Sequence, residues 1–218
     1  MSVFDPTFED LSESIPIFPL PGVLLLPGGF LPLNIFEPRY LNMTSDALGG
    51  GRMIGMIQPQ PDGDLTGDPA VYRTGCAGRI VSFEETDDGR YLITLKGVAR
   101  FDVTRELAQK DGYRLVEPDW SPYVRDLDDA DDAIPDRNSF LQSLKKYFEL
   151  NRMDANWNAI QEAPCDRLVT SVAMICPFEP SEKQALLEAA TVPERIEVLT
   201  TLVEMAVMGI SDANAGRQ

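Results

Sequence analysis

Residues 15–36 form an apolar stretch without a single charged side chain, and five prolines interrupt it. The stretch reads IPIFPLPGVLLLPGGFLPLNIF and is about long enough to cross a bilayer as a helix. Each proline removes a backbone donor and disfavours helix in the preceding residue, and Gly22, Gly28 and Gly29 loosen the chain further. The stretch therefore predicts three short strands with sharp bends, at residues 15–20, 23–26 and 30–36, inside a small barrel or folded sheet.

A helix is predicted directly after the third of these strands. Pro38 is preorganised for the first helical position. Apolar residues recur at helical spacing up to Leu48, and three consecutive glycines end the run. We therefore expect one helix, over residues 37–48, inserted among strands.

The rest of the first half is predicted to be β structure. Strands are expected at residues 52–58, 70–85, 90–107 and 113–120, with a polar loop at 59–69. Asp88-Gly89 is the residue pair that a tight hairpin turn favours, because the turn needs positive φ. Glycines at positions 75, 78 and 97 indicate bulges or corners of a curled sheet.

A change of composition divides the chain. Residues 126–136 read DLDDADDAIPD and predict a solvated linker. The pattern beyond it is helical, with capping boxes predicted at Ser181–Gln184 and Thr191–Glu194. We expect a β domain at residues 14–122 and an α-helical bundle at 134–210, an α+β protein, with helices at 136–150, 153–162, 164–176, 181–190 and 191–209.

The charge balance argues against several classes of partner. With 19 Lys and Arg against 35 Asp and Glu, the formal charge is −16, which repels nucleic acid and anionic membrane surfaces. The acidic first fourteen residues are unlike a signal peptide. Three cysteines cannot all pair, and Cys165 and Cys176 lie too far apart on one predicted helical stretch, so we expect free thiols and a cytoplasmic location.

The sequence contains few of the residue patterns that enzymes use for catalysis. The chain has no histidine, which removes the usual general base and the commonest zinc ligand. It has no glycine-rich loop ending in Gly-Lys-Ser or Gly-Lys-Thr. Residues 62–68 resemble the start of a calcium loop, but Arg73 stands where its bidentate Glu is needed, and Ser181 is better explained as a helix cap than as a partner of Lys183. We expect no enzyme, no cofactor and no metal.

Four motifs in the first half occur in a recognisable order. They are FPL at residues 18–20, LPG at 26–28, LPL at 31–33 and IFEPRY at 35–40. With weaker matches at residues 52–59, 75–80 and 88–91, the chain resembles the N-terminal, substrate-binding domain of Lon-type ATP-dependent proteases, above all the bacterial proteins in which that domain stands alone. The resemblance implies a PUA-like β pseudo-barrel followed by helices, and it covers residues 15–208.

The resemblance also implies a function. The first hypothesis is a non-catalytic module that binds unfolded or extended polypeptide, by apolar contact or along a sheet edge. The alternative is an adaptor or assembly protein whose helical bundle contacts a protease, a chaperone or a second copy of itself. In the first hypothesis, Arg39 holds the start of the helix through Glu37 or a nearby carbonyl, and the residues predicted to form or flank the binding face are Phe36, Glu37, Arg39, Tyr40, Met56 and Gln58.

Overall fold

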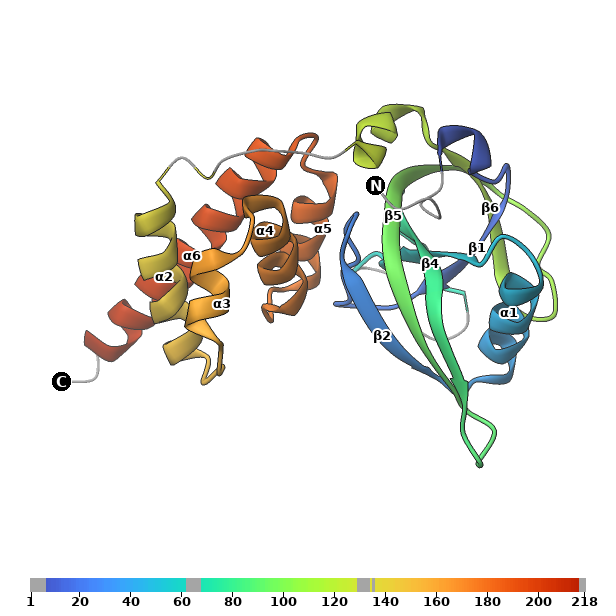
Figure 1. The fold of residues 1–218 in the computed structure, drawn as a ribbon, viewed down its shortest axis with the longest axis horizontal. Coiled ribbons are helices and arrows are strands. Elements are labelled where there is room, and N and C mark those ends of the chain that lie inside the picture. The colour runs from blue at the N-terminus through green and yellow to red at the C-terminus, as the bar shows by residue number, and fades with distance from the viewer. Residues whose placement is uncertain (1–6, 62–67, 129–133, 135, 216–218) are drawn as a thin grey trace.

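The computed structural model describes residues 7–61, 68–128, 134 and 136–215. Its first half is a six-stranded sheet with one long helix inserted after the second strand (Figure 1). This β part begins with a short 3-10 helix, η1 (Phe8–Asp10). Its further elements are β1 (Ile15–Pro19), β2 (Phe30–Ile35), α1 (Pro38–Gly49), β3 (Met53–Ile57), β4 (Thr74–Glu85), β5 (Tyr91–Glu106) and β6 (Arg114–Asp119).

The pairing of the strands closes most of the sheet on itself. The order is β2-β5-β4-β3-β1-β6, and β6 also pairs with the second half of β5. Strands β1, β3, β4, β5 and β6 therefore form a ring, while β2 pairs with the first half of β5 and lies outside it. The register shift at Ala77/Gly78 confirms the bulge predicted from Gly78, and Gly89, with φ +79°, turns the predicted β4–β5 hairpin.

The second half is helical. A 3-10 segment, η2 (Ser121–Leu127), leads from the last strand towards five helices (Figure 1). The described residues contain no helix that is long and apolar enough to cross a membrane. The helices of this helical part are α2 (Arg137–Leu150), α3 (Trp157–Glu162), α4 (Cys165–Ile175), α5 (Pro180–Glu188) and α6 (Val192–Ala215).

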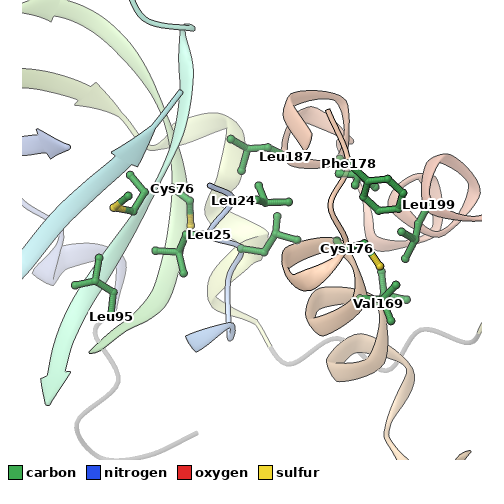
Figure 2. Close-up of a cluster of buried hydrophobic side chains, with 14 of the residues drawn as sticks. Leu24, Leu25, Cys76, Leu95, Val169, Cys176, Phe178, Leu187 and Leu199 are labelled. Carbon is green, nitrogen blue, oxygen red and sulfur yellow. The ribbon is translucent and has the colours of Figure 1, made fainter. Parts of the chain in front are cut away.

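The segment between β1 and β2 joins the two parts. We predicted a strand at residues 23–26, and this is wrong, because Val23–Leu26 has no regular structure. Leu24, Leu25 and Leu26 are buried, and Figure 2 shows Leu24 and Leu25 between side chains of the sheet and side chains of the helices. One continuous apolar core therefore includes both parts and the segment between them.

Polar contacts reinforce this junction at three places. Gln58 donates to the carbonyl of Pro180 at 2.9 Å and to the side chain of Gln184 at 3.1 Å. Lys183 donates to the carbonyl of Gly22 at 2.9 Å. Arg100 forms a buried ion pair with Asp126 at 2.7 Å and also donates to backbone carbonyls at the end of α5.

Two predictions about the acidic segment and the caps need correction. Asp126 is not solvated, because its carboxylate is buried against Arg100, whereas residues 129–133 and 135 lie outside the described residues. Helix α5 begins at Pro180, and its capping box joins Glu179 to Glu182 instead of Ser181 to Gln184. Thr191 does accept from the amide of Glu194, as predicted. The division of the chain at residues 122–134 stays a prediction.

Candidate functional site

The IFEPRY segment forms a corner between β2 and α1. Ile35 ends the strand inside the core, Glu37 is the extended N-cap residue, and Pro38 is the first residue of the helix. Arg39 thus lies in the first turn, where a cation opposes the helix dipole. The Glu37 carboxylate accepts a hydrogen bond from Arg39 Nε at 3.0 Å and offsets this unfavourable charge, so the contact expected from the sequence is present.

Arg39 also faces the loop that follows β3. Its Nη1 lies 3.9 Å from the carboxylate of Asp68, and its guanidinium carbon lies 4.6 Å from the centre of the Tyr40 ring. The Tyr40 ring is buried and packs against Phe18 of β1, with ring centres 4.2 Å apart. Burial raises the pKa of the Tyr40 hydroxyl above its ordinary value, so Tyr40 acts as a neutral aromatic wall.

The turn before β6 closes the opposite side. Gly112 has φ +85°, and a Cβ built there would lie 3.3 Å from Arg39 Cβ, so glycine suits both the backbone and the close approach. The hydroxyl of Tyr113 donates to Asp46 of α1 at 2.7 Å. Burial, with Asp46 beside it, raises the pKa of Tyr113 to about 12, and this tyrosine is therefore also neutral.

A second arginine lies beneath the turn. Arg114 is buried, pairs with Glu106 and donates to the carbonyl of Pro69 at 2.7 Å. Its guanidinium therefore holds the loop that follows β3 against the start of β6. Arg39 and Arg114 both have carboxylate partners, so the polar groups here are mutually neutralised.

These elements surround a pocket of about 130 Å³ at the end of β1. Prolines supply much of its wall, and a proline has no backbone donor to satisfy. The volume is well below the roughly 300 to 1,000 Å³ of sites for drug-sized ligands and suits one side chain better than a nucleotide. The lining residues are Ile17, Pro19, Pro21, Arg39, Tyr40, Pro59, Asp68, Pro69, Gly112, Tyr113 and Arg114.

The six residues predicted for the binding face fall into two groups. Phe36 is 64% exposed, and the side chains of Glu37 and Arg39 are partly exposed beside it. Tyr40, Met56 and Gln58 are buried, and of these three only Tyr40 lines the pocket. Gln58 joins the β part to the helical part, and Met56 of β3 packs in the apolar core that both parts share.

The sequence reasoning missed most of the pocket. Pro19 and Pro21 stood in the apolar stretch, but we interpreted them there as strand breakers only. We predict Tyr113 and Arg114 only as part of a closing strand, because nothing local relates them to a helix that ends more than sixty residues earlier. The sequence does contain a signal for this part of the pocket. Asp111-Gly112 is a residue pair typical of a turn, and it directly precedes the large side chains of Tyr113 and Arg114.

Cys76, Cys176 and Lys183 are enclosed in the interior of the molecule. The described residues contain no cluster of three or more His, Cys, Asp or Glu side chains suited to a metal ion. Cys76 and Cys176 are buried, and burial raises the pKa of both thiols, that of Cys176 to about 12. Lys183 points to the carbonyl of Gly22, and not to Ser181.

Comparison with known proteins identifies the family. The substrate-binding domain of ATP-dependent protease La (LON) matches residues 14–205. The chain belongs to this family. Lon protease of Dictyoglomus thermophilum is 26% identical over 202 residues, which are 88% of this chain and 24% of that protein. For Lon protease of Haemophilus influenzae the identity is 23%, over 90% of this chain and 24% of that protein. The chain therefore spans about a quarter of the length of these relatives.

Solved structures agree with this assignment. A Lon N-terminal domain protein from Xanthomonas campestris is 26% identical, with a TM-score of 0.61 over 86% of this chain and 97% of that one. The N-terminal domain of Lon protease from the Mycobacterium avium complex is 16% identical, with a TM-score of 0.63 over 87% of this chain and 97% of that one. The mixed α and β architecture predicted from the sequence is thus confirmed.

The corner gives a first testable expectation. Arg39→Ala removes a half-exposed ion pair and a cation–π contact, each worth up to about 1 kcal/mol. The free energy of unfolding should fall by about 1 kcal/mol and the melting temperature by about 2 to 4 °C in circular dichroism. Arg105→Ala, at an exposed pair on β5, is the control and should change little. An unchanged melting temperature together with lost polypeptide binding would make Arg39 a ligand contact instead.

Proposed function

We propose that this chain binds unfolded or extended polypeptide and that the pocket beside Arg39 and Tyr40 receives one apolar side chain of it. The family supports a substrate-binding role in general. The observation that supports the pocket is its wall of four prolines and two neutral tyrosines, with the nearby charges already paired. A pocket with such a rigid wall needs little reorganisation on binding.

Exposed apolar side chains support a polypeptide as the ligand. Phe36 lies at the same corner as the pocket-lining Arg39, and in this proposal it contacts residues that flank the bound side chain. Glu37, Arg39 and Asp68 would form the polar rim of this site. Binding would then be apolar in the pocket and polar at its edge, as in protein interfaces generally.

The proposal is tested by adding a charge to the pocket wall. Pro21 is exposed, so Pro21→Asp should leave the melting temperature nearly unchanged. A carboxylate there would be desolvated by a bound side chain, at a cost of about 1.4 kcal/mol or more, which is a tenfold loss of affinity. The measurement is fluorescence anisotropy with labelled lactalbumin that is reduced and blocked by the uncharged carbamidomethyl group, and native lactalbumin is the negative control.

A matched variant separates the pocket from a general effect of charge. Pro122→Asp also replaces an exposed proline, at the start of η2 and outside the pocket lining. Its affinity should equal that of the unmodified chain. If Pro21→Asp and Pro122→Asp lost affinity for reduced lactalbumin equally, net charge and not the pocket would govern binding.

The adaptor alternative rests on a smaller observation. Met205 and Met208 of α6 are both well exposed, as are Leu150 and Ile175, and methionine suits adaptable contact surfaces. Most of the described large apolar side chains that are exposed lie outside the helical part, however, which favours polypeptide binding by the β part. The partner in this alternative is a protease, a chaperone or a second copy of the chain. Loss of partner binding in the variant Met205→Glu would support the alternative.

The finer description of the fold belongs to the same proposal. We infer that the strand ring with its inserted helix is a PUA-like pseudo-barrel and that the five helices act as a bundle packed against it. The closed pairing of five strands and the continuous core support this description. In this arrangement the helical part holds the apolar segment between β1 and β2, and with it Pro21 of the pocket lining.

A further inference from the structure

The sheet has a free edge at the end of the β4–β5 hairpin. Strand β3 pairs with β4 only as far as Arg79, and the amide of Ile80 makes the last bond on that side, to the carbonyl of Arg52. Val81–Glu85 then pairs with β5 alone among the described residues, and all five of its side chains are exposed. Figure 1 shows this hairpin extending away from the strand ring.

The register shows which backbone groups face outwards. The amide of Thr86 bonds to the carbonyl of Arg90 at 2.9 Å. In an antiparallel ladder the bonded pairs alternate, so Glu84 and Ser82 exchange bonds with β5. The N–H and C=O groups of Phe83 and Glu85 therefore point away from the sheet, towards solvent.

The other outer edge, on β2, is protected. The amide of Gly97 bonds to the carbonyl of Gly29, which makes Leu31 and Leu33 the residues bonded to β5. Phe30, Pro32 and Asn34 face outwards, and the proline among them has no N–H to offer. A proline on an edge strand is a common protection against pairing. The edge of β4 has no such residue.

We propose that the edge of β4 at Val81–Glu85 takes up an extended polypeptide as an added strand. The proposal rests on the polypeptide-binding function above and adds a main-chain contact to the side-chain contact of the pocket. Phe83 and Val81, 42% and 48% exposed, offer apolar surface beside this edge. The ring of Phe83 is held against Tyr91 with ring centres 5.0 Å apart, so it is already ordered for contact.

Charge defines the class of segment that fits. Glu84 and Glu85 are exposed on the edge itself, and the whole chain carries a formal charge of −16. Successive side chains alternate between the two faces of the strand, so Phe83 and Glu85 share one face and Glu84 lies on the other. A strand that alternates apolar and basic residues would place an apolar side chain beside Phe83 and a basic one beside Glu84. Acidic segments would be repelled. The partner is thus an extended, basic and apolar stretch of polypeptide.

Hydrogen exchange tests the edge directly. The probe is a synthetic ten-residue peptide of alternating valine and lysine, added to the isotope-labelled full chain. The amides of Phe83 and Glu85 should exchange at least tenfold more slowly with the peptide bound, while those of Phe30 and Asn34 on the other edge stay unchanged. No slowing at Phe83 and Glu85 would overturn the proposal.

A pair of variants adds an independent measurement. Glu85→Pro deletes an outward N–H without breaking a bond to β5, and Pro32 shows that this kind of position accepts proline. Peptide affinity should fall at least tenfold in Glu85→Pro but at most threefold in Glu85→Ala, which removes the charge alone. Equal affinities in the two variants would contradict strand addition, and the exchange measurement decides if Glu85→Pro does not fold.

The experiments distinguish an error in the proposed strand addition from an error in the proposed polypeptide-binding function. If reduced lactalbumin binds and is sensitive to Pro21→Asp, but no peptide protects the amides on β4, only the edge is wrong. If the unmodified chain binds neither the peptide nor reduced lactalbumin, the polypeptide-binding function is wrong as well.

Discussion

Arg100→Met is expected to lower the free energy of unfolding by about 3 to 5 kcal/mol, the largest effect of any single change considered for this chain. The guanidinium of Arg100 is buried and bonds to both oxygens of the Asp126 carboxylate, at 2.8 and 2.7 Å. Removal of one partner from a buried pair leaves the other charge without compensation. Urea unfolding followed by circular dichroism measures the loss.

The carbonyl groups at the end of α5 add to this cost. Arg100 donates to the carbonyl of Leu187 at 3.0 Å and to that of Ala190 at 3.2 Å, and it also bonds to Ala189. It thus serves as a C-cap supplied from a strand, since the last carbonyls of a helix lack partners within the helix. Methionine keeps most of the side-chain volume but cannot donate, so the buried carbonyls of Leu187 and Ala189 would lose the bonds they receive from Arg100.

An exposed arginine on the same strand is the matched control. Arg105 pairs with Glu117 at 2.6 Å, but its side chain is 70% exposed. Arg105→Met should therefore cost at most about 1 kcal/mol. If Arg100→Met and Arg105→Met had equal costs, the junction would not depend on the buried pair.

Local signals allowed the strand-to-helix corner to be predicted from the sequence. Proline sets the first turn of α1, and Asp-Gly sets the β4–β5 hairpin, because both act through the backbone of neighbouring residues. The pairing of Arg39 with Glu37, two residues away, could be expected for the same reason. These features need no knowledge of the rest of the fold.

Features that depend on distant partners were not predictable in this way. Gln58 was expected on a binding face, but it is buried because its partners lie 122 and 126 residues further along the chain. Asp126 stood in an acidic run that favours solvent, yet Arg100 on β5 binds it. The pocket is likewise missed because its lining comes from segments far apart in the sequence: the end of β1 and the residues after it, the start of α1, the loop after β3 and the turn that leads into β6.

The wrongly predicted strand at residues 23–26 shows the same limit and leads to the second large effect. Apolar runs of this length fit a buried strand or any other buried segment, and periodicity does not separate them. The leucines here are buried without a strand partner because the helical part covers them (Figure 2). A Cβ on Gly78 would lie 2.7 Å from Leu25 Cδ2, so the leucine packs directly on the backbone of β4.

Leu25→Ala should therefore lower the free energy of unfolding by about 2 to 5 kcal/mol, the range for a leucine in a tight core. The exposed Leu92→Ala on β5 is the control and should cost less than about 1 kcal/mol. The more informative result is where the loss occurs. If the core is continuous, the β part and the helical part should lose stability together.

The two tryptophans of the chain can report on each part separately. Trp120 packs against Phe101 in the β part, and Trp157 packs against Phe148 in the helical part. In Trp157→Phe the fluorescence follows the β part, and in Trp120→Phe it follows the helical part. Leu25→Ala, made in each background, should lower the urea midpoint of both by the same amount, because the residue belongs to a core that both parts share.

A urea midpoint that falls only in the background reporting on the β part would show that the helices fold independently. In that case the division predicted between residues 122 and 134 would separate two autonomous domains, and the segment between β1 and β2 would not transmit stability from one to the other.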